Sequence, residues 1–210
     1  MPIRVLLADD HVLVRQGLKS LLEGQNFQVV GEASDGHEAV RLSEKVHPDV
    51  AVIDISMPTL NGLDAARELS HSYPKTKSIL LTQYEEEQYV HEAFEAGVKG
   101  YVLKNQAAND LIQAIQRVSR GEFYLSPGIS RAVVEAYRTK PDKPANPLTA
   151  RERQLLQLIA EGKSTKDAAS LLCISPKTAE SHRMKLMQKL DIHEVAGLVR
   201  YAVRHGVVQP

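Results

Sequence analysis

The sequence predicts an α/β unit followed by a small all-α unit, and three observations support this division. Short apolar runs alternate with segments of helical spacing over residues 1–122, which is typical of a parallel sheet covered by helices. Residues 123–147 then hold a short helical pattern, Ile129–Tyr137, and three prolines between Thr139 and Pro147, which indicates a linker. Residues 148–210 show only helical patterns, so we expect a separate helical unit there.

The charges are divided unevenly between these parts, although the whole chain has a formal net charge of zero. Residues 1–125 carry 12 Lys and Arg against 18 Asp and Glu, whereas residues 126–210 carry 14 against 8. A basic half suggests nucleic acid as its partner, and a solvated basic surface is the alternative. The composition, 43% hydrophobic and 25% charged, is ordinary for a globular protein.

The single cysteine, Cys173, excludes a disulfide within the chain, and its apolar surroundings predict a buried side chain. No apolar run reaches the roughly 18 residues of a membrane span, so we expect no membrane partner. The sequence becomes acidic at Asp9 and Asp10, too early for a signal peptide. We therefore expect a cytoplasmic protein.

The first unit alternates five predicted strands with five predicted helices. The strands are the apolar runs Ile3–Ala8, Phe27–Gly31, Ala51–Ile53, Ser78–Thr82 and Gly100–Leu103. The helices that follow them are Val12–Glu23, Gly36–Val46, Leu60–Ser70, Glu85–Ala96 and Ala107–Arg120. Right-handed crossovers then predict a flavodoxin-like (βα)5 fold with strand order 2-1-3-4-5, in which the first and third strands are neighbours.

Polar residues stand at the ends of four of these strands. Asp9 and Asp10 end the first, Asp54 the third and Thr82 the fourth, and Lys104 follows the fifth. The strand order gathers the three carboxylates in one crevice, where they repel one another unless a cation joins them. Carboxylate oxygens favour Mg²⁺, which also recruits phosphate oxygens. A carboxylate nucleophile with a metal, a hydroxyl and a lysine predicts a phosphoryl-transfer site.

Each of these residues also has a simpler interpretation. Asp54 could cap a loop, which is common for an Asp after a strand. Lys104 could be a solvated surface lysine, and Thr82 an ordinary hydroxyl at a strand end. The coincidence of four strand ends with the required groups favours the phosphoryl-transfer site.

Further residues complete a pattern over the strand ends: Asp9-Asp10, Asp54 followed by Met57-Pro58 and Asn61-Gly62, then Thr82, Tyr101 and Lys104. This pattern resembles the receiver domain of bacterial two-component response regulators, and the resemblance covers residues 1 to about 122. It implies that Asp54 accepts a phosphoryl group from a histidine kinase.

The same resemblance assigns roles to the other residues. It implies that Asp10 binds Mg²⁺ directly, that Asp9 does so through water, and that Asp54 and the backbone carbonyl of Ser56 complete the protein ligands. Lys104 would hold the phosphoryl group, Thr82 would donate a hydrogen bond to it, and Tyr101 would swing inward with Thr82. For Tyr101 the alternative is an ordinary aromatic residue in a strand.

Two positions depart from the receiver pattern. Asn105 follows Lys104 where many receivers have proline, and Gln83 follows Thr82 where a small residue is common. A glutamine there affects the access of water or small phosphodonors to the acceptor, so the rate of dephosphorylation stays open.

The second unit has the signals of four helices. Thr149 and Glu152 have the spacing of a capping box, and Gly162 ends that first helix. Ser164 or Thr165 caps a short second helix through Leu172. Ser175 caps a third, with Pro176 at its first position, which runs to about Leu190, and the fourth covers Val195–Arg204. A short helix, a turn and a longer basic helix predict a helix-turn-helix, and a plain helical bundle is the alternative.

The third helix should enter the major groove of double-stranded DNA. Its candidate contact residues are Lys177, Thr178, Glu180, Ser181, His182, Arg183, Met184, Lys185 and Lys189. Lys177 and Thr178 lie in the first turn, where the helix dipole favours phosphate. Glu180, Ser181 and Met184 share one stripe that can face base edges, and Glu180 suits cytosine N4. A Glu180 side chain in solvent, or paired with a basic residue, is the alternative.

The Leu-Thr-x-Arg-Glu opening at Leu148, Glu161-Gly162, the segment Ser175–His182 and Lys189-Leu190 resemble the DNA-binding domain of the LuxR/NarL/FixJ class of regulators. Together the two resemblances imply a response regulator that binds promoter DNA as a homodimer and is not an enzyme. One rival is an aspartyl phosphatase, which Ser56 disfavours because such enzymes place a second Asp there. The other is an unphosphorylated interaction module, which the complete acidic set disfavours.

Overall fold

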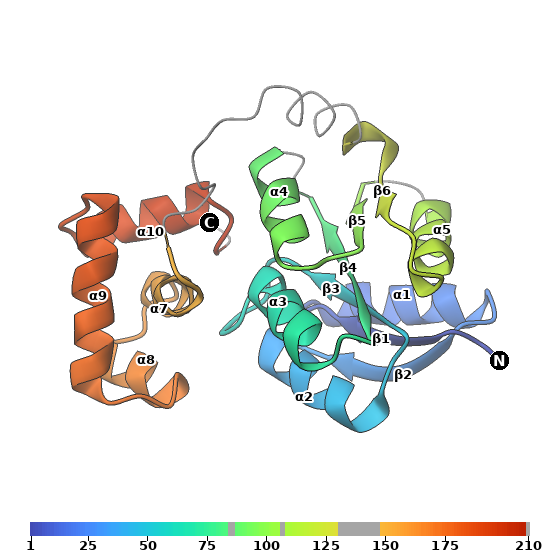
Figure 1. The fold of residues 1–210 in the computed structure, drawn as a ribbon, viewed down its shortest axis with the longest axis horizontal. Helices are drawn as coiled ribbons and strands as arrows, with labels where there is room; N and C mark the ends of the chain where they lie inside the picture. The colour runs from blue at the N-terminus through green and yellow to red at the C-terminus, as the bar shows by residue number, and fades with distance from the viewer. Residues whose placement is uncertain (84–86, 106–107, 130–147, 209–210) are drawn as a thin grey trace.

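The first unit is a six-stranded parallel sheet in the order β2-β1-β3-β4-β5-β6 (Figure 1). The computed structural model describes the chain except residues 84–86, 106–107, 130–147 and 209–210. The strands are β1 Arg4–Ala8, β2 Gln28–Ala33, β3 Val50–Asp54, β4 Lys77–Thr82, β5 Gly100–Leu103 and β6 Tyr124–Leu125. The predicted α/β fold and the order of its first five strands are confirmed, and β6 is an addition to them.

Helices cover both faces of this sheet. They are α1 Val12–Glu23, α2 Gly36–Val46, α3 Gly62–Ser72, α4 Glu87–Glu95 and α5 Ala108–Ser119. Alternate residues of β1 divide between the two layers: Val5 and Leu7 pack with α1 and α5, and Leu6 and Ala8 pack with α2, α3 and α4. The sheet is therefore buried on both sides, as its unbroken apolar runs predict.

β3 lies at the centre of the sheet, and every one of its residues is buried. Asn61 caps α3 by accepting a hydrogen bond from the backbone N–H of Asp64, so the helix begins at Gly62, two residues after the predicted start. The chain passes very close to the end of β3 here, because a Cβ atom on Gly62 would stand 1.9 Å from the carbonyl oxygen of Asp54. Glycine at this position lets the loop return against the residue that ends β3.

The second unit consists of α7 Ala150–Ala160, α8 Thr165–Leu171, α9 Pro176–Leu190 and α10 Val195–Arg204. The predicted capping box of Thr149 and Glu152 is present, Ser164 caps α8, and Ser175 caps α9 with Pro176 at its first position. Leucines such as Leu155, Leu186 and Leu198 form a core separate from that of the sheet. The helical unit is thus confirmed.

The prediction for Cys173 is wrong: the side chain is exposed. Cys173 lies in the turn between α8 and α9, where its φ of 53° is in the left-handed region. Of its apolar neighbours, Leu172 is 5% exposed but Leu171 is 45% exposed, so the apolar stretch is only partly buried. The short helix expected over Ile129–Tyr137 lies outside the described residues, apart from Ile129 itself, and so does the proline-rich segment.

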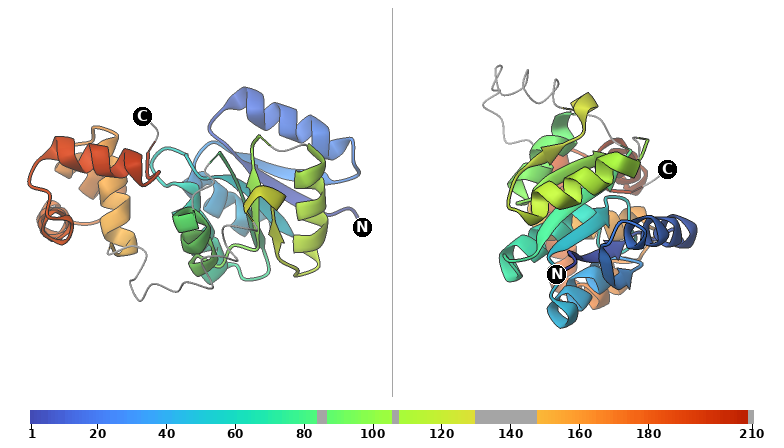
Figure 2. Two further views of the ribbon diagram at one scale, coloured as in Figure 1. Left: turned by 90° about the horizontal axis from the view of Figure 1, so that it is seen from above. Right: turned by 90° about the vertical axis from the view of Figure 1, so that its right-hand side faces the viewer.

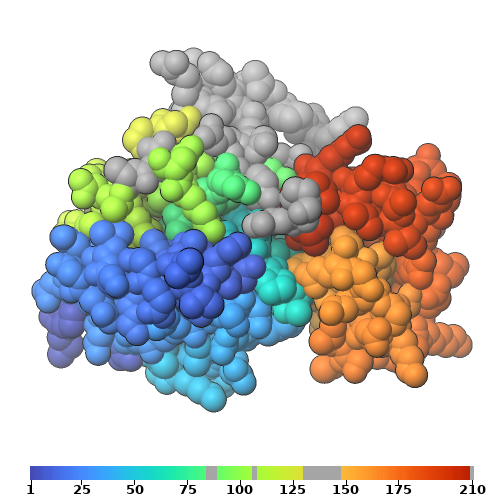
Figure 3. Space-filling model, turned by 180° about the vertical axis from the view of Figure 1, so that it is seen from behind, coloured from blue at the N-terminus to red at the C-terminus, as the bar shows by residue number. Residues whose placement is uncertain are grey.

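The two units contact each other through α7, which lies beside the loop between β3 and α3 (Figures 1 and 2). Gln157 is fully buried there, and its side-chain nitrogen donates to the carbonyl oxygen of Met57 at 2.9 Å. Glu161 accepts a hydrogen bond from the backbone N–H of Thr59 at 2.9 Å. From behind, the helical unit forms a lobe against the α/β unit (Figure 3).

Among the described residues, none of the helices combines the length and apolar character that crossing a membrane requires.

Candidate functional site

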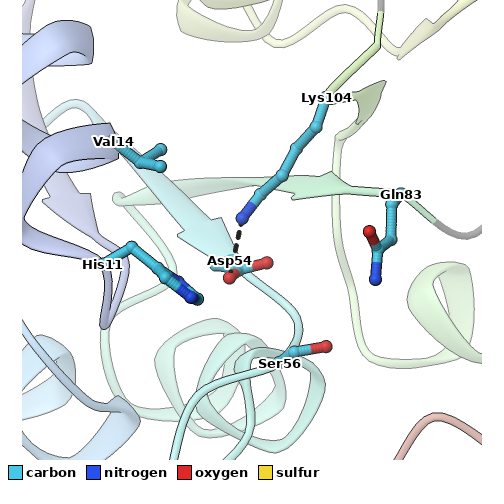
Figure 4. Close-up of a pocket in the computed structure, with 6 residues that line it drawn as sticks. All are labelled: His11, Val14, Asp54, Ser56, Gln83 and Lys104. Carbon is cyan, nitrogen blue, oxygen red and sulfur yellow. Dashed lines mark ion pairs between the residues drawn. The ribbon is translucent and has the colours of Figure 1, made fainter. Parts of the chain in front are cut away.

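The side chains expected at the strand ends do meet at the carboxyl edge of the sheet. The ammonium group of Lys104 lies 2.8 Å from Oδ2 of Asp54 and 3.0 Å from Oδ2 of Asp9. Figure 4 shows Lys104 reaching from above toward the carboxylate of Asp54. Because β1, β3 and β5 are parallel, residues far apart in the sequence arrive at one place with the same orientation.

The loop that carries Lys104 is fixed to the neighbouring strand. The backbone N–H of Lys104 donates to the carbonyl oxygen of Thr82 at 2.7 Å. Thr82 is 1% exposed at the end of β4, and Tyr101 is 1% exposed in β5. The structure thus places Thr82 at the same edge, and the ring of Tyr101 is already packed inside with the α4 layer.

Burial sets the electrostatics of the pair. Desolvation raises the pKa of Asp54 above its ordinary value, and the nearby Lys104 offsets only part of this effect. Burial alone would lower the pKa of Lys104, but the charges of Asp54 and Asp9 outweigh it and raise that pKa. The ammonium group therefore stays charged at neutral pH and faces a carboxylate that burial destabilises.

Four residues offer atoms that could hold a metal ion: Asp9, Asp10, His11 and Asp54, whose ligand atoms lie within 4.8 Å of one another. Oδ1 of Asp10 is buried without a hydrogen bond, and Nδ1 of His11 lies 2.8 Å from it. A buried carboxylate oxygen without a hydrogen bond, beside two further carboxylates, fits a hard cation bound by oxygen atoms.

A cavity of about 190 Å³ opens over Asp54. Its lining residues are His11, Val14, Asp54, Ser56, Gln83 and Lys104 (Figure 4). The sequence analysis did not single out His11 and Val14. The position of His11 directly after Asp10 is the signal that could have identified it. Gln83 also lines this cavity, and its effect on access to Asp54 stays a prediction.

The candidate DNA-contacting residues of α9 divide into two groups. Lys177, Thr178, Glu180, Ser181, Met184 and Lys185 are exposed, and Met184 is 65% exposed although it is apolar. His182 and Arg183 are partly buried, and Arg183 donates to the hydroxyl of Thr165 on α8 at 2.9 Å. In Figure 1 α9 runs along the edge of the helical unit that lies farthest from the α/β unit.

Lys189 differs from the rest of the set. Its ammonium group lies 2.6 Å from Oε2 of Glu152, the buried glutamate of the α7 capping box. Lys189 thus joins the end of α9 to the start of α7. The structure gives this residue a contact within the domain, which the sequence analysis did not consider.

Comparisons with known proteins agree with both halves of this description. The family model of the response regulator receiver domain matches residues 5–116, and the model of the bacterial regulatory proteins of the luxR family matches residues 146–202. The chain is 36% identical over 213 residues to the uncharacterized transcriptional regulatory protein YxjL of Bacillus subtilis (strain 168), covering 99% of this chain and 98% of YxjL. It is 36% identical over 211 residues to the oxygen regulatory protein NreC of Staphylococcus carnosus (strain TM300), covering 96% of this chain and 97% of NreC.

Solved structures give the same result. A two-component response regulator of the LuxR family from Aurantimonas sp. SI85-9A1 has a TM-score of 0.63 at 33% identity, over 67% of this chain and 100% of that one. The complex of the response regulator RcsB with DNA has a TM-score of 0.61 at 26% identity, over 96% of this chain and 98% of that one. The chain therefore belongs to the LuxR class of response regulators, transcriptional regulators in which a receiver domain precedes a LuxR-type DNA-binding domain.

Proposed function

We propose that Asp54 accepts a phosphoryl group from a sensor histidine kinase, with Mg²⁺ as cofactor, and that this step controls dimerisation and the binding of promoter DNA. The observation that carries the proposal is the pairing of Lys104 with Asp54 at 2.8 Å beneath a cavity of about 190 Å³. A nucleophile with a fixed cation, open to the outside, is the arrangement that phosphoryl transfer requires.

Asp9, Asp10, Asp54 and the backbone carbonyl of Ser56 would hold Mg²⁺. The bound ion would supply positive charge to the oxygens of the transferred group. Asp54 contributes the attacking oxygen: its bond to phosphorus forms as the bond between phosphorus and the donor's imidazole nitrogen breaks. Burial destabilises the ionised Asp54, which favours a reaction that consumes its charge at that oxygen.

The other residues orient the transferred group. Lys104 would move its ammonium from the carboxylates to a phosphoryl oxygen, and Thr82 would donate its hydroxyl to another. Lys104 needs little movement because it already lies within 3.0 Å of both Asp9 and Asp54. Tyr101 lies opposite Leu80 on β4, two residues before Thr82, and packs with the α4 layer, so it would report the change to the α4 side of the domain.

The second half of the proposal places α9 in the major groove of double-stranded DNA. The exposed residues Lys177 and Thr178 at its N-terminal turn would contact phosphate, and Glu180, Ser181 and Met184 would face base edges. RcsB, a structural neighbour over nearly the full chain, has been solved with DNA bound. A homodimer would place two such helices on two half-sites.

We infer a cytoplasmic regulator with a receiver at residues 1–122, a linker at 123–147 and a DNA-binding domain at 148–210, and no enzymatic substrate of its own.

Phosphorylation at Asp54 is tested with the purified chain, Mg²⁺ and phosphoramidate as donor. We expect an acyl phosphate, which hydroxylamine removes, to form only when Asp54 is intact. Asp54→Asn should give no phosphorylated species. Asp35→Asn is the matched control, because Asp35 follows β2 and caps α2, and asparagine caps equally well. Phosphate on Asp54→Asn would show that another residue is the acceptor.

A further inference from the structure

A single buried hydroxyl, that of Ser126, joins the two segments on either side of Lys104. Ser126 is fully buried, and its Oγ accepts a hydrogen bond from the backbone N–H of Leu103 at 3.2 Å. The same hydroxyl donates to Oδ2 of Asp110. Leu103 ends β5 directly before Lys104, and Asp110 lies in the first turn of α5. Ser126 therefore links the residue before Lys104 to the first turn of α5.

Ser126 is itself anchored by the strand before it. β6 pairs in parallel with β5, and the backbone N–H of Ser126 donates to the carbonyl oxygen of Tyr101 at 3.0 Å. The hydroxyl of Tyr124 donates to Oδ1 of Asp110, so the Asp110 carboxylate accepts hydrogen bonds from two hydroxyl groups of the same short segment. Of these residues, only Ser126 also bonds Leu103.

The contacts of Lys104 with Asp9 and Asp54 depend on the position of its backbone. The lysine side chain has four rotatable carbon–carbon bonds and a single charged end, so its position depends on where its backbone is held. At Lys104 the backbone N–H donates to Thr82 on one side. Ser126 supplies a second restraint on this backbone, because it bonds the preceding residue, Leu103.

We propose that Ser126 is a positioning residue for phosphoryl transfer to Asp54, which it serves by fixing Leu103, the residue before Lys104, against Asp110 of α5. This inference rests on the proposed function of Asp54. The hydroxyl uses its single proton for Asp110 and accepts the Leu103 N–H, so no smaller or apolar side chain reproduces both bonds. The transferred group never touches Ser126.

The test compares Ser126→Ala with Tyr124→Phe in the full chain. Both variants remove a hydroxyl that bonds Asp110, but only Ser126→Ala frees Leu103. With phosphoramidate and saturating Mg²⁺, we expect Ser126→Ala to slow phosphorylation of Asp54 on the order of ten-fold, since small displacements of a positioned group cost rate steeply. Tyr124→Phe should stay within about two-fold of the unmodified chain on the same grounds.

Mg²⁺ affinity, followed by NMR titration, separates positioning from general damage. It should not fall in Ser126→Ala, because the expected metal ligands stand at the ends of β1 and β3, and a displaced Lys104 would only compete less for Asp9 and Asp54. A variant whose site is merely disordered would lose affinity and rate together. If Ser126→Ala does not fold, Ser126→Cys replaces it, because a thiol is a weak acceptor for the Leu103 N–H and a weak donor to Asp110.

A double-mutant cycle with Lys104→Ala decides the outcome. If Ser126 acts through Lys104, the Ser126→Ala change has no further effect on the rate once Lys104 is removed. Equal slowing by Ser126→Ala with and without Lys104, or an unchanged rate in the single variant, would overturn the inference. Failure of the unmodified chain to be phosphorylated at Asp54 would instead refute the proposed function, so the two failures are distinguishable.

Discussion

The side-chain oxygen of Gln157 on α7 accepts two hydrogen bonds from Asn61, one from its backbone N–H at 3.0 Å and one from its side-chain amide at 3.1 Å. Asn61 is the residue that caps α3 in the receiver. Gln157 of the DNA-binding domain thus accepts hydrogen bonds from the last residue of the loop between β3 and α3. Arg153, one turn earlier, lies 3.7 Å from Asp64 and 3.4 Å from Glu92, so the same helix also places a cation between two buried receiver carboxylates.

This relationship predicts that Gln157→Ala separates the domains. The change leaves the Asn61 N–H and the Met57 carbonyl without their partner, which costs about 1–3 kcal/mol for a buried group. We expect a larger radius of gyration by small-angle X-ray scattering. Gln154→Ala is the control, since Gln154 bonds Arg151 on its own helix. Equal radii for both variants would mean that Gln157 does not hold the domains together.

Replacing Asp54 should stabilise the unliganded fold. Burial raises the pKa of Asp54, so its ionised form is disfavoured in the folded state. For a carboxyl with a raised folded pKa, stability is fully present below the unfolded pKa and is lost as the pH rises through the folded pKa. In the absence of Mg²⁺, Asp54→Asn should therefore gain about 0.5–2 kcal/mol at neutral pH, and the gain should disappear in acid. Urea unfolding at several pH values measures this, and a loss of stability at neutral pH would contradict it.

Gly62→Ala should unfold or deform the site. Its Cβ would stand 1.9 Å from the backbone oxygen of Asp54, and a backbone atom cannot move aside as a flexible side chain can. We expect a loss of more than about 3 kcal/mol in the free energy of unfolding and no phosphorylation of Asp54. Gly17→Ala is the contrasting change: nothing lies within 4 Å of its Cβ inside α1, so a gain of about 0.5–1 kcal/mol is expected. Similar unfolding curves for the two variants would refute the close approach.

Lys189 should contribute to folding as well as to DNA binding. Burial would raise the pKa of Glu152, but the bonds from Lys189 and Thr149 outweigh it and hold that pKa below its ordinary value. This contribution is present above the unfolded pKa and is lost as the pH falls through the folded pKa. Lys189→Met should therefore destabilise the helical domain by about 1 kcal/mol at neutral pH and by less in acid. Lys185→Met, a change on the exposed side of α9, should leave stability within about 0.5 kcal/mol.

Two residues of α9 should affect DNA binding differently. Lys177→Ala is expected to weaken all sequences alike and to lower the salt slope by about one unit, since a phosphate contact carries no base preference. Glu180→Ala should relax the preference at one base pair by about 1–3 kcal/mol. Binding titrations with a series of mutated operators at several salt concentrations separate the two effects. An unchanged operator preference in Glu180→Ala would place that side chain in solvent.

The local sequence was sufficient to predict which residues stand at the strand ends and which residues cap the helices. Asp9, Asp54, Thr82 and Lys104 follow apolar runs, and parallel strands bring their carboxyl ends to one edge whatever the details of packing. The caps at Ser175 and Thr149 depend on hydrogen bonds to residues three positions away, so they can be recognised from spacing alone.

Only the tertiary structure decided the contacts between distant segments. Gln157 meets Asn61 across 96 residues, and Ser126 meets Leu103 through β6, a two-residue strand too short to give a pattern. Cys173 lies in an apolar stretch of sequence yet is exposed, because the turn faces outward. The periodicity of apolar residues reports which face of a helix or strand is buried, and it does not apply to a turn such as that of Cys173. The partner of a buried polar group such as Gln157 or Ser126 depends on which distant segment the packed fold brings beside it.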